Sequence, residues 1–573
     1  MNYARQQNRR FRTIAAFAAA TVVLTLAVAA IPAQAQTPTV IYSFPGGSEP
    51  ANPNAEAIAQ GRDGNLYTTT AYGGTVGQTG GGTVFKITPG GTVTVVYPET
   101  SSLGPYGGAY PYSGVTLGTD GLFYGTNYYG GAGGHGEVYK VTAAGVVTPL
   151  HSFAGTGDGA NPFSPPIEGT NGVFYGTTSS ITATVNSTAY SVTSGGTFNT
   201  LHTFTGTDGQ NVYAPLVQGT DGNFYGNTAA GGTGDGVIFK MAPSGAVTVL
   251  HTFAGTDGSN ASYPLIQASD GNFYGTTSTG GSSNAGVVFK ITAGGTYNVI
   301  YNLNGTTDGA GPSSGLVQAT NGKLYGVTEN LNVGLGTIFS VTTSGTFTTL
   351  YSFTAADYPD GGYPVSPLIQ HTDGLLYGTT YVGGNPSNGC QSILYPGGEP
   401  TVYNGCGVFY KLNVGLGPFV SLLPRSGKEG ASIGILGQGF TSASVVRFDG
   451  VTAVSTTRGS NFISATVPAG TLTGSVTVTT GATTRTSNKA FRVTPTFPSF
   501  NPTSGPVSTP VVLTGTGLTQ TTKVTFGGVA ATTVTVNSDT QVTADVPTGA
   551  VTGKIIIVTN GGIAESTTEF TVN

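Results

Sequence analysis

The chain has 573 residues, of which only 8% are charged, against roughly 25% in an ordinary soluble domain. Glycine is frequent, at 93 residues, but aromatic residues make up 10%, which excludes a disordered low-complexity chain. Gly, Thr, Ser and Asn suit turns, while Val, Ile, Phe and Tyr suit strands. The composition therefore predicts an all-β protein that is long enough for several domains.

The first 35 residues have the pattern of an export signal. Four arginines precede an apolar run over residues 14–31, and Ala33 and Ala35 stand in the A-x-A positions of a cleavage site. We predict a signal peptide over 1–35; an uncleaved anchor is the alternative, because the run approaches the length of a membrane span. Cleavage leaves 16 basic and 25 acidic residues, a net charge of −9. With so few cations we expect no nucleic-acid partner, and we expect a secreted or cell-surface bacterial protein without a membrane span.

One ten-residue string recurs along the first two thirds of the chain. "GTDGNFYGNT" (219–228) returns as "GTDGLFYGTN" (118–127), "GTNGVFYGTT" (169–178) and "ASDGNFYGTT" (268–277). Counting the weaker copies, its tyrosine falls at Tyr67, Tyr124, Tyr175, Tyr225, Tyr274, Tyr325 and Tyr377. Seven copies at intervals of 49 to 57 residues indicate a repeat architecture.

Each copy predicts four short antiparallel strands, at 214–219, 223–228, 236–241 and 246–253 in the copy quoted first. Its Asp-Gly step supplies the positive-φ residues of a tight hairpin. Four such strands repeated radially make a β-propeller blade. The array begins with a lone fourth-type strand (39–44) and ends with a third-type strand (407–412), so the N-terminal strand completes the last blade and removes the open edges. We predict a seven-bladed propeller over residues 36–416.

The C-terminal third predicts two β-sandwich units, at 417–495 and 496–573. "LLPRSGKEGASIGILGQGF" (422–440) is echoed by "FNPTSGPVSTPVVLTGTGL" (500–518), and each string opens a stretch of about 75 residues of short strands with Pro and Gly turns.

Both regions resemble known families. The "LHTF", "GTDG", "DGNFYGTT" and "GVVFKIT" motifs over residues 39–412 resemble the GloVer tandem repeats of exported bacterial proteins. The C-terminal units resemble IPT/TIG immunoglobulin-like domains through P-x-S-G, G-x-G-[FL], V-x-F-[GD]-G and V-P-x-G. The first resemblance implies a fold and an extracytoplasmic location but no established catalytic residues. The second implies spacer or contact modules.

The only two cysteines, Cys390 and Cys406, are separated by 15 residues in a chain that we expect to be exported. An oxidising environment favours a disulfide between them. Closing a loop of this length contributes roughly 3 kcal/mol of stability.

Tyrosines are frequent in the loops that join each fourth strand to the next first strand. Among Gly, Asn and Ser, such rings suit stacking on sugars or adaptable protein contact. The alternative is that these rings wedge between blades. The candidate ligand-binding residues are Tyr106, Tyr112, Tyr213, Tyr263 and Tyr363.

A second candidate is a ring of side chains three residues before each hairpin Asp or Asn. We expect the first strand of a blade to line the central channel, which would bring these side chains together. The alternative is that the amides satisfy the unpaired inner strand edges. The seven positions are Gln60, Leu117, Glu168, Gln218, Gln267, Gln318 and Gln370.

Two further patterns concern metals. His151, His202 and His251 occupy a repeat slot that elsewhere holds Tyr, so we predict an aromatic packing position with a polar tip instead of a metal cluster. The loops "DGAN" (158–161), "DGQN" (208–211) and "DGSN" (257–260) offer oxygens to calcium, although Asx turns explain the same residues. We predict no cofactor, with calcium as the alternative.

The sequence shows no assembled acid, base or nucleophile, and "GPSSG" (311–315) lacks the strand-to-helix turn that a nucleophilic serine needs. We therefore expect a monomeric, non-enzymatic binding or scaffold protein. Its propeller would contact a glycan or an extracellular protein, with the Ig-like domains as a stalk. The alternative is an exported propeller enzyme, such as a copper oxidase or a lyase.

Overall fold

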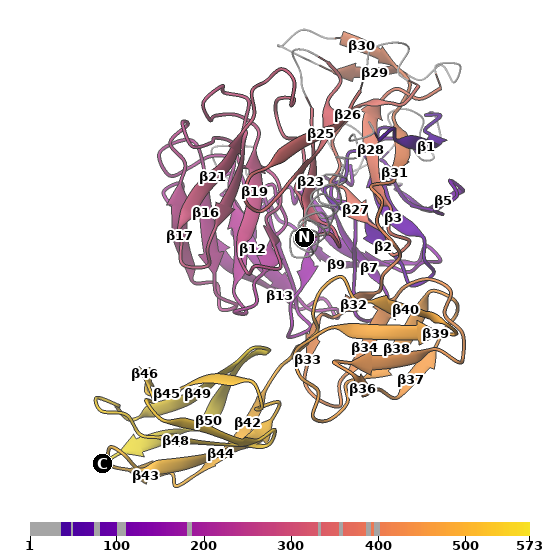
Figure 1. Ribbon diagram of the computed structural model, residues 1–573. Coiled ribbons are helices and arrows are strands. Elements are labelled where there is room, and N and C mark those ends of the chain that lie inside the picture. The colour runs from indigo at the N-terminus through magenta and orange to yellow at the C-terminus, as the bar shows by residue number, and fades with distance from the viewer. Residues whose placement is uncertain are drawn as a thin grey trace, which may run out of the picture. The chain divides into compact units, whose positions relative to one another are not determined.

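Seven antiparallel sheets follow one another along the first two thirds of the chain in the computed structural model (Figure 1). The structure describes residues 36–46, 50–73, 81–99, 110–179, 186–329, 334–353, 359–385, 391–394 and 401–573, so the predicted signal peptide lies outside it. Every regular element in these ranges is a strand, as the composition predicts. Within the same ranges no helix is long and apolar enough to cross a membrane.

The first six sheets each contain four strands in chain order, which is the predicted blade. The blades are, in turn, β2 (Ala59–Gln60), β3 (Leu66–Thr70), β4 (Thr83–Ile87) and β5 (Val93–Pro98); β6 (Thr116–Leu117), β7 (Phe123–Asn127), β8 (Glu137–Val141) and β9 (Val147–Ser152); β10 (Ile167–Glu168), β11 (Phe174–Thr177), β12 (Thr188–Val192) and β13 (Phe198–Thr203); β14 (Val217–Gln218), β15 (Phe224–Asn227), β16 (Val237–Met241) and β17 (Val247–Thr252); β18 (Ile266–Gln267), β19 (Phe273–Thr277), β20 (Val287–Ile291) and β21 (Tyr297–Asn302); β22 (Val317–Gln318), β23 (Leu324–Thr328), β24 (Thr337–Val341) and β25 (Phe347–Ser352).

The seventh blade closes the ring with the N-terminal strand. It contains β27 (Ile369–Gln370), β28 (Leu376–Val382), β31 (Val408–Leu412) and β1 (Thr39–Ser43), with the short β26 (Gly362–Pro364) also on β28. Strand β1 pairs antiparallel with β31, and Figure 1 shows the indigo β1 beside the orange β31. This confirms the predicted closure, which leaves no blade without its outer strand. Between β28 and β31 the chain adds a separate hairpin, β29 (Gln391–Leu394) with β30 (Thr401–Asn404).

The hairpin between the first and second strands differs from the prediction in one respect. Gly222 has a φ of 84°, but Asp221 is not in the positive-φ region, so only the glycine takes the left-handed conformation. The Gly222 amide donates to the Gly219 carbonyl, which defines a β-turn whose last residue is Gly222. The carboxylate of Asp221 serves a different purpose: it accepts a hydrogen bond from the Tyr225 hydroxyl at 2.7 Å.

The same tyrosine joins neighbouring blades. In the first, second and fourth blades its ring stacks on a phenylalanine of the next blade, at 4.0 Å for Tyr67 on Phe123 and 3.9 Å for Tyr225 on Phe273. The ring is almost fully buried while the hydroxyl reaches the turn Asp. The recurring string therefore fixes a turn and packs two blades together, which explains its repetition.

The glutamines of the predicted ring link each blade to the one before it. The Oε1 atom of Gln60 accepts the backbone N–H of Thr372 at 3.1 Å, so the first blade is tied to the seventh. Gln218, Gln267, Gln318 and Gln370 accept the equivalent N–H of their preceding blades, and Glu168 accepts the N–H of Thr119. Leu117 has no polar group to offer, and there the Arg62 guanidinium donates instead to the Thr119 carbonyl at 2.7 Å.

Two sandwich units follow the propeller, and each has the same strand order. The first contains the sheets β32 (Ser421–Leu423), β34 (Ser432–Leu436), β38 (Phe462–Thr466), β37 (Ser455–Thr457) and β36 (Val451–Thr452), β35 (Val445–Phe448), β39 (Val476–Thr480), β40 (Thr483–Thr486), with the pair β33 (Ser426–Gly427) and β41 (Arg492–Val493). The second contains β42 (Thr496–Asn501), β44 (Pro510–Thr516), β48 (Gln541–Asp545), β47 (Val534–Ser538) and β43 (Ser504–Gly505), β50 (Gly562–Val572), β49 (Gly553–Thr559), β45 (Thr521–Phe526), β46 (Val529–Ala530).

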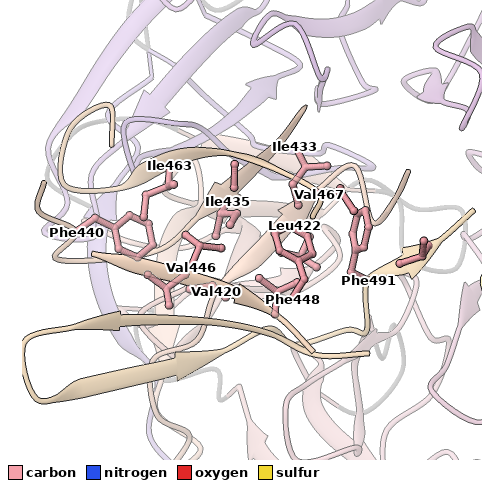
Figure 2. Close-up of a cluster of buried hydrophobic side chains, with 14 residues drawn as sticks. Val420, Leu422, Ile433, Ile435, Phe440, Val446, Phe448, Ile463, Val467 and Phe491 are labelled. Atoms are coloured by element: carbon pink, nitrogen blue, oxygen red, sulfur yellow. The ribbon is translucent and has the colours of Figure 1, made fainter. Parts of the chain in front are cut away.

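Figure 2 shows the core of the first sandwich unit. Ile435, Val446 and Phe448 are buried side chains from the two facing sheets, and they meet in one apolar cluster. The alternation of buried and exposed residues along β34 and β35 is the pattern of a sheet with one face on a core.

Polar side chains of the first sandwich unit contact the hairpin turns of the propeller. Asn461 donates to the Asp63 carbonyl at 2.7 Å, and the Arg62 guanidinium lies 4.6 Å from the centre of the Phe462 ring. Lys489 donates to Oε1 of Gln318, so one member of the glutamine ring also binds this unit. The turn side of the propeller is thus in contact with the chain's own next unit, and the loops at the opposite ends of the strands remain as a candidate binding surface.

Removing one amide of the glutamine ring tests how far these links stabilise the propeller. In Gln60→Leu the buried Thr372 N–H loses its acceptor, so we expect a loss of about 1–3 kcal/mol in the free energy of unfolding. Gln218→Leu is the matched control, because the Thr170 N–H is exposed and water replaces the amide; we expect a loss below about 1 kcal/mol. Urea unfolding monitored by circular dichroism measures both, and equal losses would contradict the argument.

Candidate functional site

The loop face of the first three blades carries an open aromatic pocket of about 530 Å³. Its walls come from the connections that enter β2, β6 and β10 and from those that follow β3 and β7. The lining residues are Asn54, Tyr72, Tyr110, Tyr112, Tyr128, Tyr129 and Phe163.

The rings of this pocket contact one another and so hold their positions. Tyr112 stacks between Tyr110 and Phe163, with ring centres 5.9 and 5.4 Å apart and interplanar angles of 14° and 17°. Tyr128 meets Tyr112 edge-on at 5.7 Å and Tyr129 at 4.7 Å. Such offset and edge-on contacts stabilise an aromatic cluster and fix the orientation of its faces before a ligand binds.

The pocket is polar but carries no charge. Its lining contains no Asp, Glu, Lys, Arg or His side chain. Burial and then the neighbouring Tyr72 and Tyr381 hydroxyls raise the pKa of Tyr112 above its ordinary value. Burial also raises the pKa of Tyr128. The phenols therefore remain neutral donors and acceptors, a set that suits an uncharged ligand with hydroxyl groups.

The predicted ligand-binding tyrosines are dispersed. Tyr112 lines the pocket, and Tyr213 lies at its margin, where its ring meets Phe163 edge-on at 5.5 Å. Tyr263 is partly exposed but belongs to another part of the loop face. Tyr363 is only 2% exposed and packs in an apolar core cluster. It therefore packs between blades, as in the alternative to ligand binding. Tyr106 lies outside the described residues.

Tyr263 lies close to two buried carboxyl groups. Its pKa is raised by burial and then by Glu329 and Glu56. Burial raises the pKa of Glu56 to about 8, and one of its carboxyl oxygens has no hydrogen-bond partner among the described residues. Burial raises the pKa of Glu329 as well. Glu56 therefore favours the neutral, protonated form near neutral pH.

The side chains at the histidine position donate hydrogen bonds to the aspartates of the Asp-Gly loops. His202 donates to Asp208 at 2.7 Å and His251 to Asp257 at 2.9 Å, and in the fifth blade Tyr301 donates to Asp308. Burial opposes ionisation of Asp208, but the Thr205 N–H and His202 hold its pKa below the ordinary value. The aromatic tip and the loop carboxylate thus form a structural pair, and calcium at these loops stays a prediction.

The copper-enzyme alternative requires several ligands at one point. Within the described ranges, no group of three or more His, Cys, Asp or Glu side chains is placed to hold a metal ion.

Cys406 is buried beside the seventh blade, but Cys390 lies outside the described residues, so the predicted disulfide stays a prediction.

Tyr112 is the one lining residue among the five tyrosines selected from the sequence. Tyr110 and Phe163 lie in the same kind of loop, whereas Asn54, Tyr72, Tyr128 and Tyr129 were missed. Three of them carry a signal in the repeat alignment: Tyr72 and the pair Tyr128-Tyr129 directly follow the second strand, where the fourth and fifth repeats have only Ala, Ser or Thr. Asn54 carries no signal, because its repeat neighbours vary and no pattern marks an amide there.

The fold and the pocket define a class: an all-β chain with a closed seven-bladed propeller, an aromatic loop face and immunoglobulin-like units. The model of the Gloeobacter/Verrucomicrobia repeat matches residues 27–234 and 214–395, which together exceed half of the chain. The chain belongs to this family. The IPT/TIG domain model matches residues 495–572, so the second sandwich unit is an IPT/TIG domain. The first unit shares its strand order, and its assignment to the same class stays a prediction.

Comparison with solved structures gives only distant likenesses, and no curated protein sequence matches the chain. A surface glycan-binding protein from Prevotella bryantii is 15% identical, over 27% of this chain and 38% of that one, with a TM-score of 0.21. SGBP-B from a xyloglucan utilization locus of Bacteroides uniformis is 23% identical, over 25% and 46%, with a TM-score of 0.14. A fungal alcohol oxidase in complex with copper is 12% identical, over 80% and 100%, with a TM-score of 0.43. The chain thus spans less than half the length of the two glycan-binding proteins, and no functional argument rests on these low scores.

The buried carboxyl of Glu56 predicts a pH dependence of stability. Its folded-state pKa of about 8 exceeds the ordinary value of 4.5, so between these values the folded state binds more protons than the unfolded state. This contribution to stability is therefore full below about pH 4.5 and decreases as the pH rises toward 8. In Glu56→Gln we expect the fall in melting temperature from pH 5 to pH 8 to be shallower than in the wild type. Calorimetry over this range measures it, and parallel pH profiles would contradict the assignment.

Proposed function

We propose that the chain is a non-enzymatic glycan-binding protein of the bacterial cell exterior, with the aromatic pocket of the first three blades as its binding site. The observation that carries the proposal is the pocket itself: five tyrosines, a phenylalanine and an asparagine around about 530 Å³, without a charged side chain. The export pattern of the first 35 residues supports a location outside the cytoplasm.

The chemistry of the lining suits a neutral sugar. A pyranose ring presents a flat C–H face that packs on an aromatic ring, and its hydroxyls need both donors and acceptors at the edge. Tyrosine supplies the ring and the hydroxyl in one side chain with few rotatable bonds, so little entropy is lost on binding. Asn54 adds an amide, which both donates and accepts. An anionic polysaccharide would find no cation on this surface.

The enzyme alternative has no comparable observation in its favour. Among the described residues, no group of three or more His, Cys, Asp or Glu side chains is placed to hold a metal ion. The histidines of the second to fourth blades are already paired with the aspartates of the loops that follow their strands.

A pair of tyrosine variants locates the binding site. Tyr112→Ala removes the ring at the centre of the stack, and we expect at least a tenfold loss of affinity, since stacking and hot-spot contacts of this size are worth about 1.4 kcal/mol or more. Tyr263→Ala removes a loop-face tyrosine outside the pocket, and we expect affinity within about twofold of the wild type. Affinity electrophoresis in neutral polysaccharides such as xyloglucan, glucomannan and xylan measures both variants.

Circular dichroism and melting temperature serve as the folding controls. Loss of binding in Tyr263→Ala with retention in Tyr112→Ala would move the site away from the pocket. Absence of binding by the wild-type protein to every polysaccharide would contradict the proposed function, and a protein partner would then be sought by affinity capture on the same variants.

A further inference from the structure

One slot of the repeat holds a buried acid where every other blade holds a hydrocarbon side chain. The residue after each fourth strand donates its N–H to the start of the third strand; it is Phe44, Phe153, Phe204, Phe253, Leu303 or Phe353, and in the first blade it is Glu99. The six apolar residues are at most 2% exposed, and Glu99 is 3% exposed. A carboxyl group thus occupies a position that the fold normally fills with a ring, at a large desolvation cost.

Two further repeat positions, both close to Glu99, also carry residues that differ from those of the other blades. The third residue after the repeat tyrosine is Thr in six blades but Asn127 in the second blade, where it is 1% exposed. Its cross-strand partner, the first residue of β8, is Glu137, where the equivalent residue of the other blades is Thr or Val. Three polar substitutions therefore meet at the junction between the first and second blades.

The polar atoms of these residues face one another. The Asn127 amide donates to Oε1 of Glu137 at 3.0 Å and also lowers the pKa of Glu99, so it lies between the two carboxyl groups. The Tyr139 ring occupies the position that packs on the apolar slot in other blades, as Tyr190 does on Phe153. Burial and then the charges of Glu99 and Glu137 raise the pKa of Tyr139, which places its hydroxyl beside both acids.

Several of these buried oxygens lack a hydrogen-bond partner. They are Oε1 of Glu99, Oδ1 of Asn127 and the Tyr139 hydroxyl, within the part of the chain that the structure describes. A half-turn of the Asn127 amide would direct its Oδ1 to the same place as the carboxylates. No cationic side chain is among the causes that shift either acid: burial and Glu137 raise the pKa of Glu99, and burial raises that of Glu137.

We propose that Glu99, Asn127 and Glu137, with the hydroxyl of Tyr139, bind one calcium-type divalent cation between the first and second blades. A buried acid and a half-buried acid side by side without a counter-charge are unfavourable, and a bound cation supplies that charge. All four side chains offer oxygen and none offers nitrogen or sulfur, which is the donor set of Ca²⁺ and not of zinc or copper. Calcium also tolerates irregular geometry, so backbone carbonyls and water complete its shell.

Equilibrium dialysis of the purified protein against ⁴⁵Ca²⁺, after treatment with chelator, tests the site. We expect the wild type to bind one ion per chain with a Kd no weaker than about 10⁻³ M, the range of extracellular calcium modules. Glu99→Phe restores the residue of the other blades, so we expect it to fold normally and to lose this ion. Glu137→Thr restores the side chain of three other blades, and we expect at least a tenfold loss of affinity.

Two controls place the ion. Glu329→Gln changes a buried acid of the sixth blade and is expected to bind as the wild type does. Asp208→Asn changes an Asp-Gly loop, and loss of the ion in this variant alone would transfer the site to the loops and overturn the proposal. Uptake by Glu99→Phe equal to that of the wild type, or no uptake by the wild type at millimolar Ca²⁺, would also overturn it. If Glu99→Phe does not fold, the near-isosteric Glu99→Gln gives the same decision.

Discussion

The ring depends on one polar contact that is repeated at six of the seven blade junctions. A side chain from the first strand of each blade reaches back to the preceding blade and accepts a backbone N–H, and Gln60 to Thr372 joins the ends of the series. Because every blade presents the same N–H, the contact sets the angle between blades as well as their attachment. Where Leu117 provides no acceptor, the Arg62 guanidinium donates across the junction to the Thr119 carbonyl, so a different bond joins these two blades. Strain at one junction would otherwise accumulate around a closed ring.

Much of this architecture follows from the sequence because its causes are local and periodic. The seven tyrosines, the glycines of the turns and the unpaired strand at each end of the array specify the blade and its closure with β1. The prediction that the hairpin Asp takes a positive φ was wrong. Turn statistics describe backbone angles, and they do not reveal the hydrogen bond that its carboxylate accepts from the tyrosine hydroxyl four residues away. Likewise, the slot of His202 was recognised as an aromatic position, but its partner Asp208 was assigned to an Asx turn or to calcium. The residue type at either repeated position does not by itself show that the two positions are in contact.

The candidate site was less accessible to sequence reasoning for a related reason. A single loop tyrosine does not show whether it lines a pocket or packs against a neighbouring blade: Tyr110 and Tyr363 each precede a Pro in equivalent loops, but Tyr110 lines the aromatic pocket and Tyr363 packs in an apolar core cluster. The pocket arises from convergence of two kinds of loop, before the first strand and after the second, in consecutive blades. Departures from the repeat were the better guide. Glu99 and Asn127 stand where no other repeat has the same residue, and Tyr72 and Tyr128 stand where the third to sixth repeats have no tyrosine.

These departures gather in one part of the ring. Glu99 begins the connection between β5 and β6, while Tyr110 and Tyr112 lie at its other end and line the aromatic pocket. The two proposed sites therefore involve residues at the two ends of one connection. The repeat scaffold permits this because its stability is spread over seven equivalent junctions, which leaves one connection free to carry residues that packing alone would not select.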